Sequence, residues 1–261
     1  SPRILGAALA APLLNAVAIV AGTAGSFAMA VVRLDVPRAL FRTSENAGLP
    51  ALTLKEGALP PFVHHFYVDS TPKIVDVDFG SKDWHSILVG GLGKGGHAYY
   101  ALDVTSPSDI LTETDAAAKV LWEFSDTDLG YTYGPPIITK TAGFGGQWVV
   151  IVPSGYNNAS GEGKIWFLDA KTGAVLKTMS TGVGSAGSPA GLAQIASFTQ
   201  DYHNYMSDEV YGGDQYGNVW RFDLRDTDAS KWSVGLFAKL TDAEGNTQPV
   251  TTAPQIEIDI A

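Results

Sequence analysis

A strand–turn–strand pattern that returns four times along the chain is the strongest constraint on its fold. Each copy has an apolar run, a glycine-rich turn and a second apolar or aromatic run, which ends in aspartate in three of the copies. The four copies cover Ala16–Val31, His85–Asp103, Trp148–Asp169 and Asp208–Asp223. The first copy matches the pattern least well. An internal repeat of this kind indicates a fold built from stacked, similar units.

Each hairpin has further short runs on its flanks, rich in β-branched and aromatic residues. Upstream runs begin at Pro72, Pro136 and Gly191, and a further candidate begins at Pro249. Downstream runs cover Val120–Phe124, Ala174–Thr178 and Val234–Leu240. Four strands per unit joined by tight turns is the pattern of a β-propeller blade. We therefore predict an all-β protein, a β-propeller whose blades have four antiparallel strands each.

The spacing of the repeats limits how many blades the chain can hold. The turn glycines Gly22, Gly91, Gly155 and Gly213 lie roughly 60–70 residues apart, whereas compact blades take about 40–50. The blades must therefore carry inserted loops, and 37–68 is interpreted as an inter-blade insertion. We expect residues 1–261 to form one propeller domain with three complete blades and part of a fourth. Closed propellers have about four to eight blades, so this one is modified or incomplete.

The same repeats identify the expected core. We predict that Trp122, Trp166 and Trp220 lie on blade strands, because each occupies an apolar run. The inter-blade core is predicted to contain the apolar residues that alternate along the hairpins, namely Ile87, Val89, Val149, Ile151, Val210, Val219 and Phe222.

Charge and composition exclude several classes of partner. The net charge of −10 and the pI near 4.8 disfavour nucleic acid, because an acidic surface repels phosphate. The chain has no cysteine, which excludes disulfides and thiolate metal sites. No charged residue occurs between Ile4 and Val32, a length that could span a membrane. Pro12, Asn15 and glycines interrupt this stretch, so we predict a buried hairpin and no membrane span.

Three motifs that suggest ligands have simpler structural interpretations. Gly91–Gly96 matches a dinucleotide fingerprint, but a strand-like run follows it where the fingerprint needs a helix, so a hairpin turn is expected. The pair His64–His65 suggests a metal site, but adjacent side chains on a strand point to opposite faces, so a structural role is expected. Asp76–Asp83 could supply oxygen ligands to a cation, yet a solvated turn between two strands is the better interpretation.

Several collinear segments resemble the PilY/PilC family of bacterial type IV pilus assembly proteins and tip-associated adhesins. The resemblance covers about residues 37 to 254. It rests on Phe66–Pro72, Leu88–Thr105, Val120–Pro135, Ser154–Asn158, Val210–Leu224 and Gln248–Pro254.

This resemblance implies a C-terminal modified propeller that acts through protein contacts and not as an enzyme. Implied partners are minor pilins at the pilus tip and a host-surface receptor. The implied role is to promote pilus assembly, oppose retraction and contribute to adhesion. The implied location is the pilus tip, the outer-membrane surface or the extracellular space.

The family also implies a calcium loop before the strand that follows Asp208. Its ligands alternate along the loop and a central glycine allows the sharp turn. Here Gln200 and Tyr202 occupy ligand positions and Tyr205 occupies the glycine position. The candidate ligands are Asp201, Asn204 and Asp208. Because only two are carboxylates, we predict weak or absent calcium binding.

Two alternative functions remain open. Gly163–Ala174 resembles the blade motif of quinoprotein dehydrogenases, whose propellers hold pyrroloquinoline quinone. A quinone site needs converging charged groups and a metal, and the sequence singles out no such set. The second alternative is a carbohydrate-binding propeller with aromatic platforms. Most tyrosines and tryptophans occupy strand positions, however, where core packing is their usual role.

Overall fold

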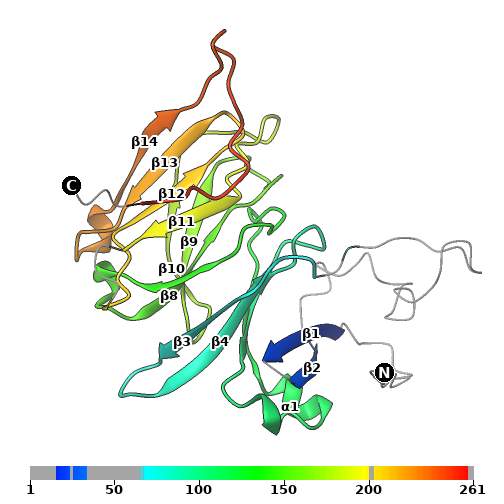
Figure 1. Cartoon of the computed structure of the whole chain (residues 1–261). Helices are drawn as coiled ribbons and strands as arrows, with labels where there is room; N and C mark the ends of the chain where they lie inside the picture. Colours follow the sequence, from blue (N-terminus) through cyan, green and yellow to red (C-terminus); the bar gives the residue numbers. More distant parts are fainter. Residues whose placement is uncertain (1–15, 24–25, 34–65, 67, 200–202, 258–261) are drawn as a thin grey trace, which may run out of the picture.

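The strands form three four-stranded antiparallel sheets and one separate two-stranded sheet. The computed structural model describes residues 16–23, 26–33, 66, 68–199 and 203–257. Within each large sheet the strands follow chain order, so every neighbouring pair is a simple hairpin. Figure 1 shows the sheets one after another along the chain, from cyan to orange. The prediction of an all-β protein with four-stranded blades is therefore confirmed.

The three blades repeat one plan, with the outer strand last. Blade 1 consists of β3 (Lys73–Asp78), β4 (Trp84–Gly91), β5 (Tyr99–Asp103) and β6 (Val120–Phe124). Blade 2 consists of β7 (Ile137–Lys140), β8 (Trp148–Pro153), β9 (Lys164–Asp169) and β10 (Val175–Ser180). Blade 3 consists of β11 (Gln194–Phe198), β12 (Glu209–Gly213), β13 (Asn218–Asp223) and β14 (Ser233–Lys239). In each blade the pairing of the last two strands contains one register shift, which increases local twist.

In the described residues, helical structure is confined to short connections. The α-helix α1 (Glu113–Ala117) begins with a capping box, in which Thr112 and Asp115 each bond the other's backbone. The 3₁₀ turns are η3 (Pro107–Asp109), η4 (Ala142–Phe144) and η5 (Ala229–Lys231). In the part of the chain that is described, no helix is long and apolar enough to cross a membrane.

The aspartate that ends each repeated run has a common local role. Asp103, Asp169 and Asp223 each end the third strand of a blade. The side-chain oxygen of each accepts the backbone N–H two residues later, from Thr105, Lys171 and Arg225 at 2.9, 3.0 and 3.1 Å respectively. Such a turn gives a hydrogen-bond acceptor to a backbone N–H where the chain leaves the strand, which explains why the repeat ends in aspartate.

Apolar cores lie between successive blades. One cluster joins blades 1 and 2 and includes Ile87, Val89, Trp122, Val150 and Trp166. A second joins blades 2 and 3 and includes Val149, Ile151, Phe167, Val210 and Phe222. A third, smaller cluster on β4 and β5 contains Leu88, Tyr100 and Leu102. Alternating residues of one strand thus serve two interfaces, as the pleat requires.

Most of the predicted core is confirmed, and the three tryptophans lie on β6, β9 and β13. Val219 is the exception, because it is only partly buried. It lies on β13 between the buried Asn218 and Trp220, so the pleat turns it away from blade 2. The expectation was wrong because blade 3 has a described neighbour on one face only.

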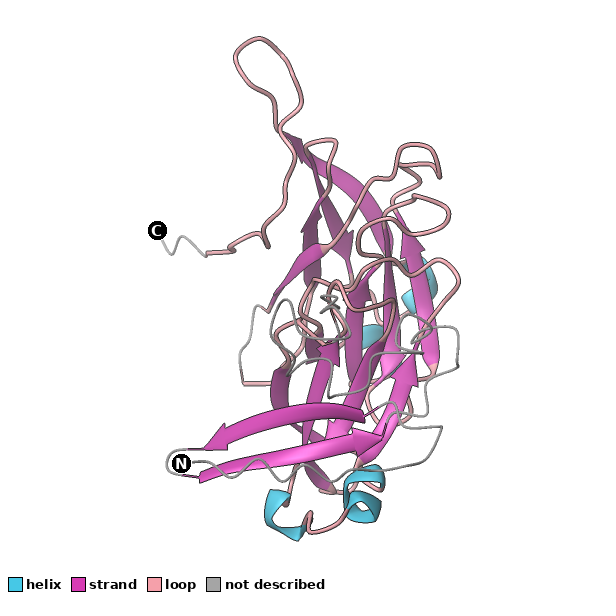
Figure 2. Cartoon of the chain, turned by 90° about the vertical axis from the view of Figure 1, so that its right-hand side faces the viewer, coloured by secondary structure: helices cyan, strands magenta, loops and turns pink. Residues whose placement is uncertain are grey.

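Two further expectations are corrected. Pro249–Thr252 forms no strand and runs as a loop, with Val250 N–H donating to the Asp214 carbonyl at 2.9 Å. The predicted N-terminal hairpin is present as β1 (Ala16–Thr23) and β2 (Ser26–Arg33). It forms its own sheet beside α1 instead of part of a fourth blade, and Figure 2 shows it crossing the lower end of the blades. Almost all of the 37–68 insertion lies outside the described residues.

Candidate functional site: the connections between blades

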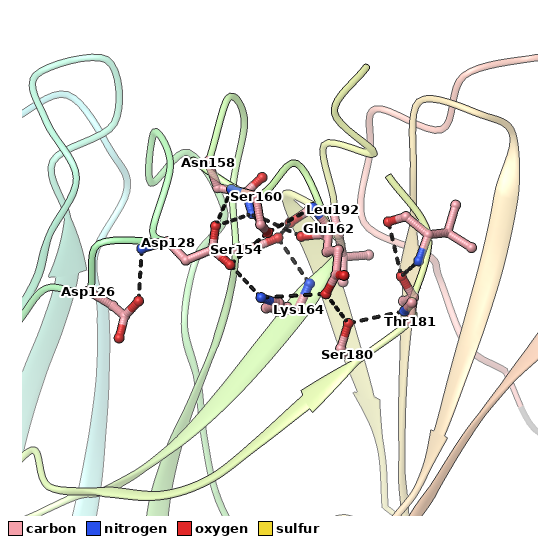
Figure 3. A network of polar contacts seen from close by, with 12 residues as sticks. Asp126, Asp128, Ser154, Asn158, Ser160, Glu162, Lys164, Ser180, Thr181 and Leu192 are labelled. Carbon is pink, nitrogen blue, oxygen red and sulfur yellow. Dashed lines mark hydrogen bonds and ion pairs between the residues drawn. The ribbon is translucent and has the colours of Figure 1, made fainter. Parts of the chain in front are cut away.

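The segment that leaves blade 1 is held against blade 2 by the carboxylate of Asp128. Asp128 lies between β6 and β7, and its partners lie around the β8–β9 turn (Figure 3). Its Oδ1 accepts from the Ser160 backbone N–H at 2.6 Å and from Asn158 Nδ2 at 3.1 Å. Its Oδ2 accepts from Ser160 Oγ at 2.8 Å and from Lys164 Nζ at 2.5 Å. We call these four residues the Asp128 clasp.

The clasp continues through blade 2 toward the next connection. Glu162 lies 3.5 Å from Lys164 Nζ and accepts from Ser180 Oγ at 2.9 Å. Ser154 Oγ accepts from the Lys164 backbone N–H at 3.1 Å and donates to the Leu192 carbonyl at 3.4 Å. Figure 3 shows these contacts as one continuous network across the ends of the strands. Through Ser154 and Glu162, the network around the clasp therefore reaches the linkers on both sides of blade 2.

Partial burial sets the electrostatics of the clasp. The side chains of Asp128 and Lys164 are only 15% and 21% exposed. Burial alone would raise the pKa of Asp128, but hydrogen bonds from Lys164 and Ser160 outweigh it and hold that pKa below its usual value. Hydrogen bonding to Asp128 raises the pKa of Lys164. Because four donors already occupy the carboxylate, Asp128 is suited to holding segments together and not to acting as a free base.

A neutral clasp lies at the other end of blade 2. The Tyr205 carbonyl accepts from the Lys140 backbone N–H at 2.9 Å and from Thr139 Oγ1 at 2.8 Å. Ser207 N–H donates to the Lys140 carbonyl at 2.9 Å, and the Thr139 and Ser207 hydroxyls lie 2.7 Å apart. The Tyr205 ring packs on Trp148, with ring centroids 5.5 Å apart. We call this the Thr139 clasp, and it docks the β11–β12 loop of blade 3 onto β7.

The predicted calcium ligands fall in this docked loop. Asp201 lies outside the described residues. Asn204 is described, and its Oδ1 accepts the Met206 N–H at 2.7 Å. The backbone of Asp208 is paired at both its N–H and its carbonyl, with Phe198 and Leu224. Tyr205 has a φ of 58°, so the sharp turn expected at a glycine is made here by tyrosine. Weak or absent calcium binding, with Asp201, Asn204 and Asp208 as the ligands of any ion that binds, stays a prediction.

In the described ranges, no cluster of three or more histidine, aspartate or glutamate side chains could hold a metal ion. Gly91–Gly96 joins β4 to β5, so it is the expected hairpin turn, and Gly93 has a φ of 61°. Asp76–Asp83 covers the end of β3 and the exposed turn before β4. The pair His64–His65 lies outside the described residues.

Sequence reasoning missed the Asp128 clasp. The partners of Asp128 follow it by 30 to 36 positions, and nothing in a polar linker marks which turn it will meet. One available signal was that Asp128 and Asn158 both lie in segments that resemble the pilus family.

Comparisons with known proteins agree on one family. Residues 51–256 match the family model of the PilY1 beta-propeller domain. A type IV pilus biogenesis factor PilY1 homolog from Xylella fastidiosa is 35% identical over 207 residues, which is 75% of this chain and 13% of the relative. The type IV pilus biogenesis factor PilY1 of Pseudomonas aeruginosa is 33% identical over 195 residues, 72% of this chain and 15% of the relative.

A solved structure gives the same result. The C-terminal domain of Pseudomonas aeruginosa PilY1 superposes with a TM-score of 0.61 at 32% identity, covering 73% of this chain and 41% of that domain. The chain thus spans about one seventh of the curated relatives and less than half of the solved domain.

Proposed function

Since this chain belongs to the PilY1 β-propeller family, we propose that it is a non-enzymatic interaction module of a type IV pilus biogenesis factor. Its relatives are named as pilus biogenesis factors. In this proposal the blades form a rigid platform that promotes pilus assembly and opposes retraction through contacts with minor pilins. The module acts at the pilus tip or on the outer surface of the cell.

The observation that carries the proposal is what the family segments build in this fold. Val120–Pro135 contains β6 and the linker with Asp128, and Ser154–Asn158 contains the turn that receives it. Val210–Leu224 contains the hairpin of β12 and β13. These segments pack or connect blades, and Asp128 is fully engaged by four donors. Because the segments that resemble the family hold the blades together, they support a structural role for the domain.

Surface piliation tests the proposal in the host bacterium. Deleting residues 68–257 from the full-length factor should reduce the number of surface pili. Inactivating the retraction motor in the same strain should partly restore them, because assembly would then be unopposed. Unchanged piliation after the deletion, with the remainder of the factor present at normal levels, would contradict the role in assembly.

A binding experiment tests the partner class. The purified chain should retain minor pilins of the same organism in a pull-down, and the variant Asp128→Ala should retain fewer because its blades are less firmly joined. Major pilin and an unrelated β-propeller serve as controls. Equal retention of minor pilins by the chain and by the unrelated propeller would argue against a specific contact.

The dehydrogenase alternative is tested separately. Purified chain, supplied with pyrroloquinoline quinone, calcium and an alcohol, should not reduce an electron-accepting dye. Quinone-dependent dye reduction would favour the enzyme and would remove the non-enzymatic part of the proposal.

A further inference from the structure

Four aromatic side chains form a continuous row at the end of the blades that carries the Asp128 clasp. His97 lies between β4 and β5, Tyr131 and Tyr133 lie in the linker after β6, and Tyr156 lies in the β8–β9 turn. We call these residues the aromatic row. We propose that the aromatic row binds a neutral, soluble oligosaccharide. This inference does not depend on a role in pilus assembly.

Ring contacts connect the row from blade 1 to blade 2. The ring centroids of His97 and Tyr131 are 4.6 Å apart, those of Tyr131 and Tyr133 are 6.4 Å apart, and those of Tyr133 and Tyr156 are 5.8 Å apart. Tyr133 is 37% exposed, and the other three side chains are partly exposed. Trp122, Trp148, Trp166 and Trp220 lie on strands and are buried, whereas Trp84 at the start of β4 is 53% exposed. Exposed rings therefore also occur on strands, at Trp84 and at Phe237 of β14, but the aromatic row joins rings from the loops of two blades into one surface.

The backbone beneath the row is fixed. Tyr131 and Tyr156 pair as an isolated antiparallel bridge, with Tyr131 N–H donating to the Tyr156 carbonyl at 2.8 Å. On one side of Tyr133, the fully buried Thr132 accepts the Leu92 N–H at 2.8 Å. On the other side, the Gly134 carbonyl accepts from Tyr99 Oη at 2.9 Å. Rings on a fixed backbone lose little entropy when a ligand binds.

Polar groups with unused hydrogen-bonding capacity surround the rings. Among the described residues, the hydroxyls of Tyr131, Tyr133 and Tyr156 have no hydrogen-bond partner. Burial and the nearby Asp69 carboxylate raise the pKa of Tyr133, so its hydroxyl remains a donor at neutral pH. Among the described residues, the Asp69 carboxylate accepts a hydrogen bond through Oδ1 alone, from the Lys94 N–H at 2.8 Å. Gln215 and Tyr156 lie side by side over Gly191, which has a φ of 65°. Because Gly191 has no side chain, both residues have room there.

This mixture of groups fits a sugar better than the other ligands that aromatic surfaces bind. Sugar hydroxyls both donate and accept, and they can pair with phenols, the Gln215 amide and the free oxygen of Asp69. The apolar faces of sugar rings can pack on the tyrosines. An acidic chain with Asp69 beside the row disfavours sulfated or carboxylated sugars. The neighbouring tyrosine rings are tilted by 55° and 61° to each other, so they do not form the flat platform that crystalline cellulose would need.

Calorimetric titration of the intact chain tests the inference. The probes are maltotetraose, cellotetraose, lacto-N-tetraose and tetra-N-acetylchitotetraose, with microcrystalline cellulose in a sedimentation assay. At least one soluble probe should bind with a Kd in the millimolar range or tighter, and cellulose should not sediment the protein. Tyr133→Ala and Tyr156→Ala should each weaken binding by about tenfold, the value of one ring contact. Tyr133→Phe should weaken it less, because the ring face remains.

A matched control separates the row from aromatic surface in general. Phe237 is 62% exposed on β14 and contacts another ring, that of Tyr211 at 5.3 Å. Phe237→Ala should leave sugar binding unchanged, and all variants should retain the wild-type melting temperature. The inference is overturned if none of the four sugars binds, or if Phe237→Ala weakens binding as much as Tyr133→Ala. Decaproline binding to the row in preference to every sugar would also overturn it.

Discussion

The junction between blades 1 and 2 and the junction between blades 2 and 3 have similar apolar cores but different polar connections. Both cores combine aliphatic residues with aromatic rings from both blades. The first junction is closed by the Asp128 clasp, which contains a partly buried ion pair. The second is closed by the Thr139 clasp, which uses a backbone carbonyl and two hydroxyls. The repeated fold therefore keeps its apolar contacts and varies the chemistry at its ends.

This difference separates two contributions to stability. Apolar burial depends on area and shape, and both junctions meet the same requirement. An ion pair adds strength only while both partners are charged, and removing one partner leaves the other in a poorly solvated place. Neutral hydrogen bonds contribute less but do not respond to pH. The first junction should therefore be the acid-sensitive one.

The largest effects are expected in the cores, where the two junctions should behave alike. Trp166 and Phe167 are adjacent on β9, and the pleat directs them to opposite junctions. They are 3% and 0% exposed. Trp166→Ala and Phe167→Ala should each lower the free energy of unfolding by about 3–5 kcal/mol, as measured by urea denaturation. A cost below about 1 kcal/mol for either variant would mean that the corresponding junction is not closely packed.

The Asp128 clasp should give the next largest effect. Asp128→Ala removes four hydrogen bonds and leaves Lys164 without its shortest contact. We expect a loss of about 2–4 kcal/mol in the free energy of unfolding, because the site is only partly buried. A double-mutant cycle with Lys164→Met should show coupling of about 1–2 kcal/mol. Additive effects of the two substitutions would show that the ion pair contributes little.

Acidification should weaken the first junction selectively. The pKa of folded Asp128 is below its usual value, so the clasp contributes stability above the unfolded pKa of about 3.9 and loses it as the pH falls through the folded pKa. Arg225 lowers the pKa of Asp223 to about 2, so the whole chain loses some stability in acid. The test is the difference in the free energy of unfolding between wild type and Asp128→Asn, which should shrink between about pH 5 and pH 2. A difference that stays constant over this pH range would contradict the assignment of the acid sensitivity to Asp128.

The Thr139 clasp should give a smaller, pH-independent effect. Thr139 is 5% exposed, and Thr139→Val keeps its shape while removing the hydroxyl that bonds the Tyr205 carbonyl and Ser207. The Tyr205 carbonyl would retain the bond from Lys140 N–H. We expect a loss of about 1–2 kcal/mol, equal at pH 7 and pH 4 in urea denaturation. A loss that grows in acid would show that a charged group contributes at this junction.

The sequence predicted the features that the two junctions share and missed the features in which they differ. Glycine turns, apolar runs and the closing aspartates located all three blades, because each blade must meet the same local requirements. Asp128 and Thr139 act through contacts with residues 30 or more positions away, and no local pattern marks such pairs. Val219 was misplaced for a similar reason, since the pleat orients it but the presence of a neighbouring blade decides its burial.

The aromatic row illustrates the same limit. In the sequence its tyrosines stand out only as parts of motifs that resemble the pilus family, because loops carry no periodicity that predicts which rings will meet. The blades bring together residues from three connections, and only the fold shows that they form one surface.

Calcium should give the smallest effect, and it should be confined to the Thr139 clasp. Asn204 Oδ1 and the Tyr205 carbonyl, two oxygens of the loop, already accept protein N–H or O–H donors, so an ion would have to compete with existing bonds. If calcium binds through Asp201, Asn204 and Asp208 with a Kd of about 1 mM, then about 1 mM calcium adds only about 0.4 kcal/mol. That corresponds to a rise of roughly 1 °C in melting temperature, and titration calorimetry should detect weak binding or none. Tight binding that disappears in Asp208→Ala, with Thr139→Val more sensitive to chelation than wild type, would instead mean that an ion and the Thr139 clasp hold this loop together.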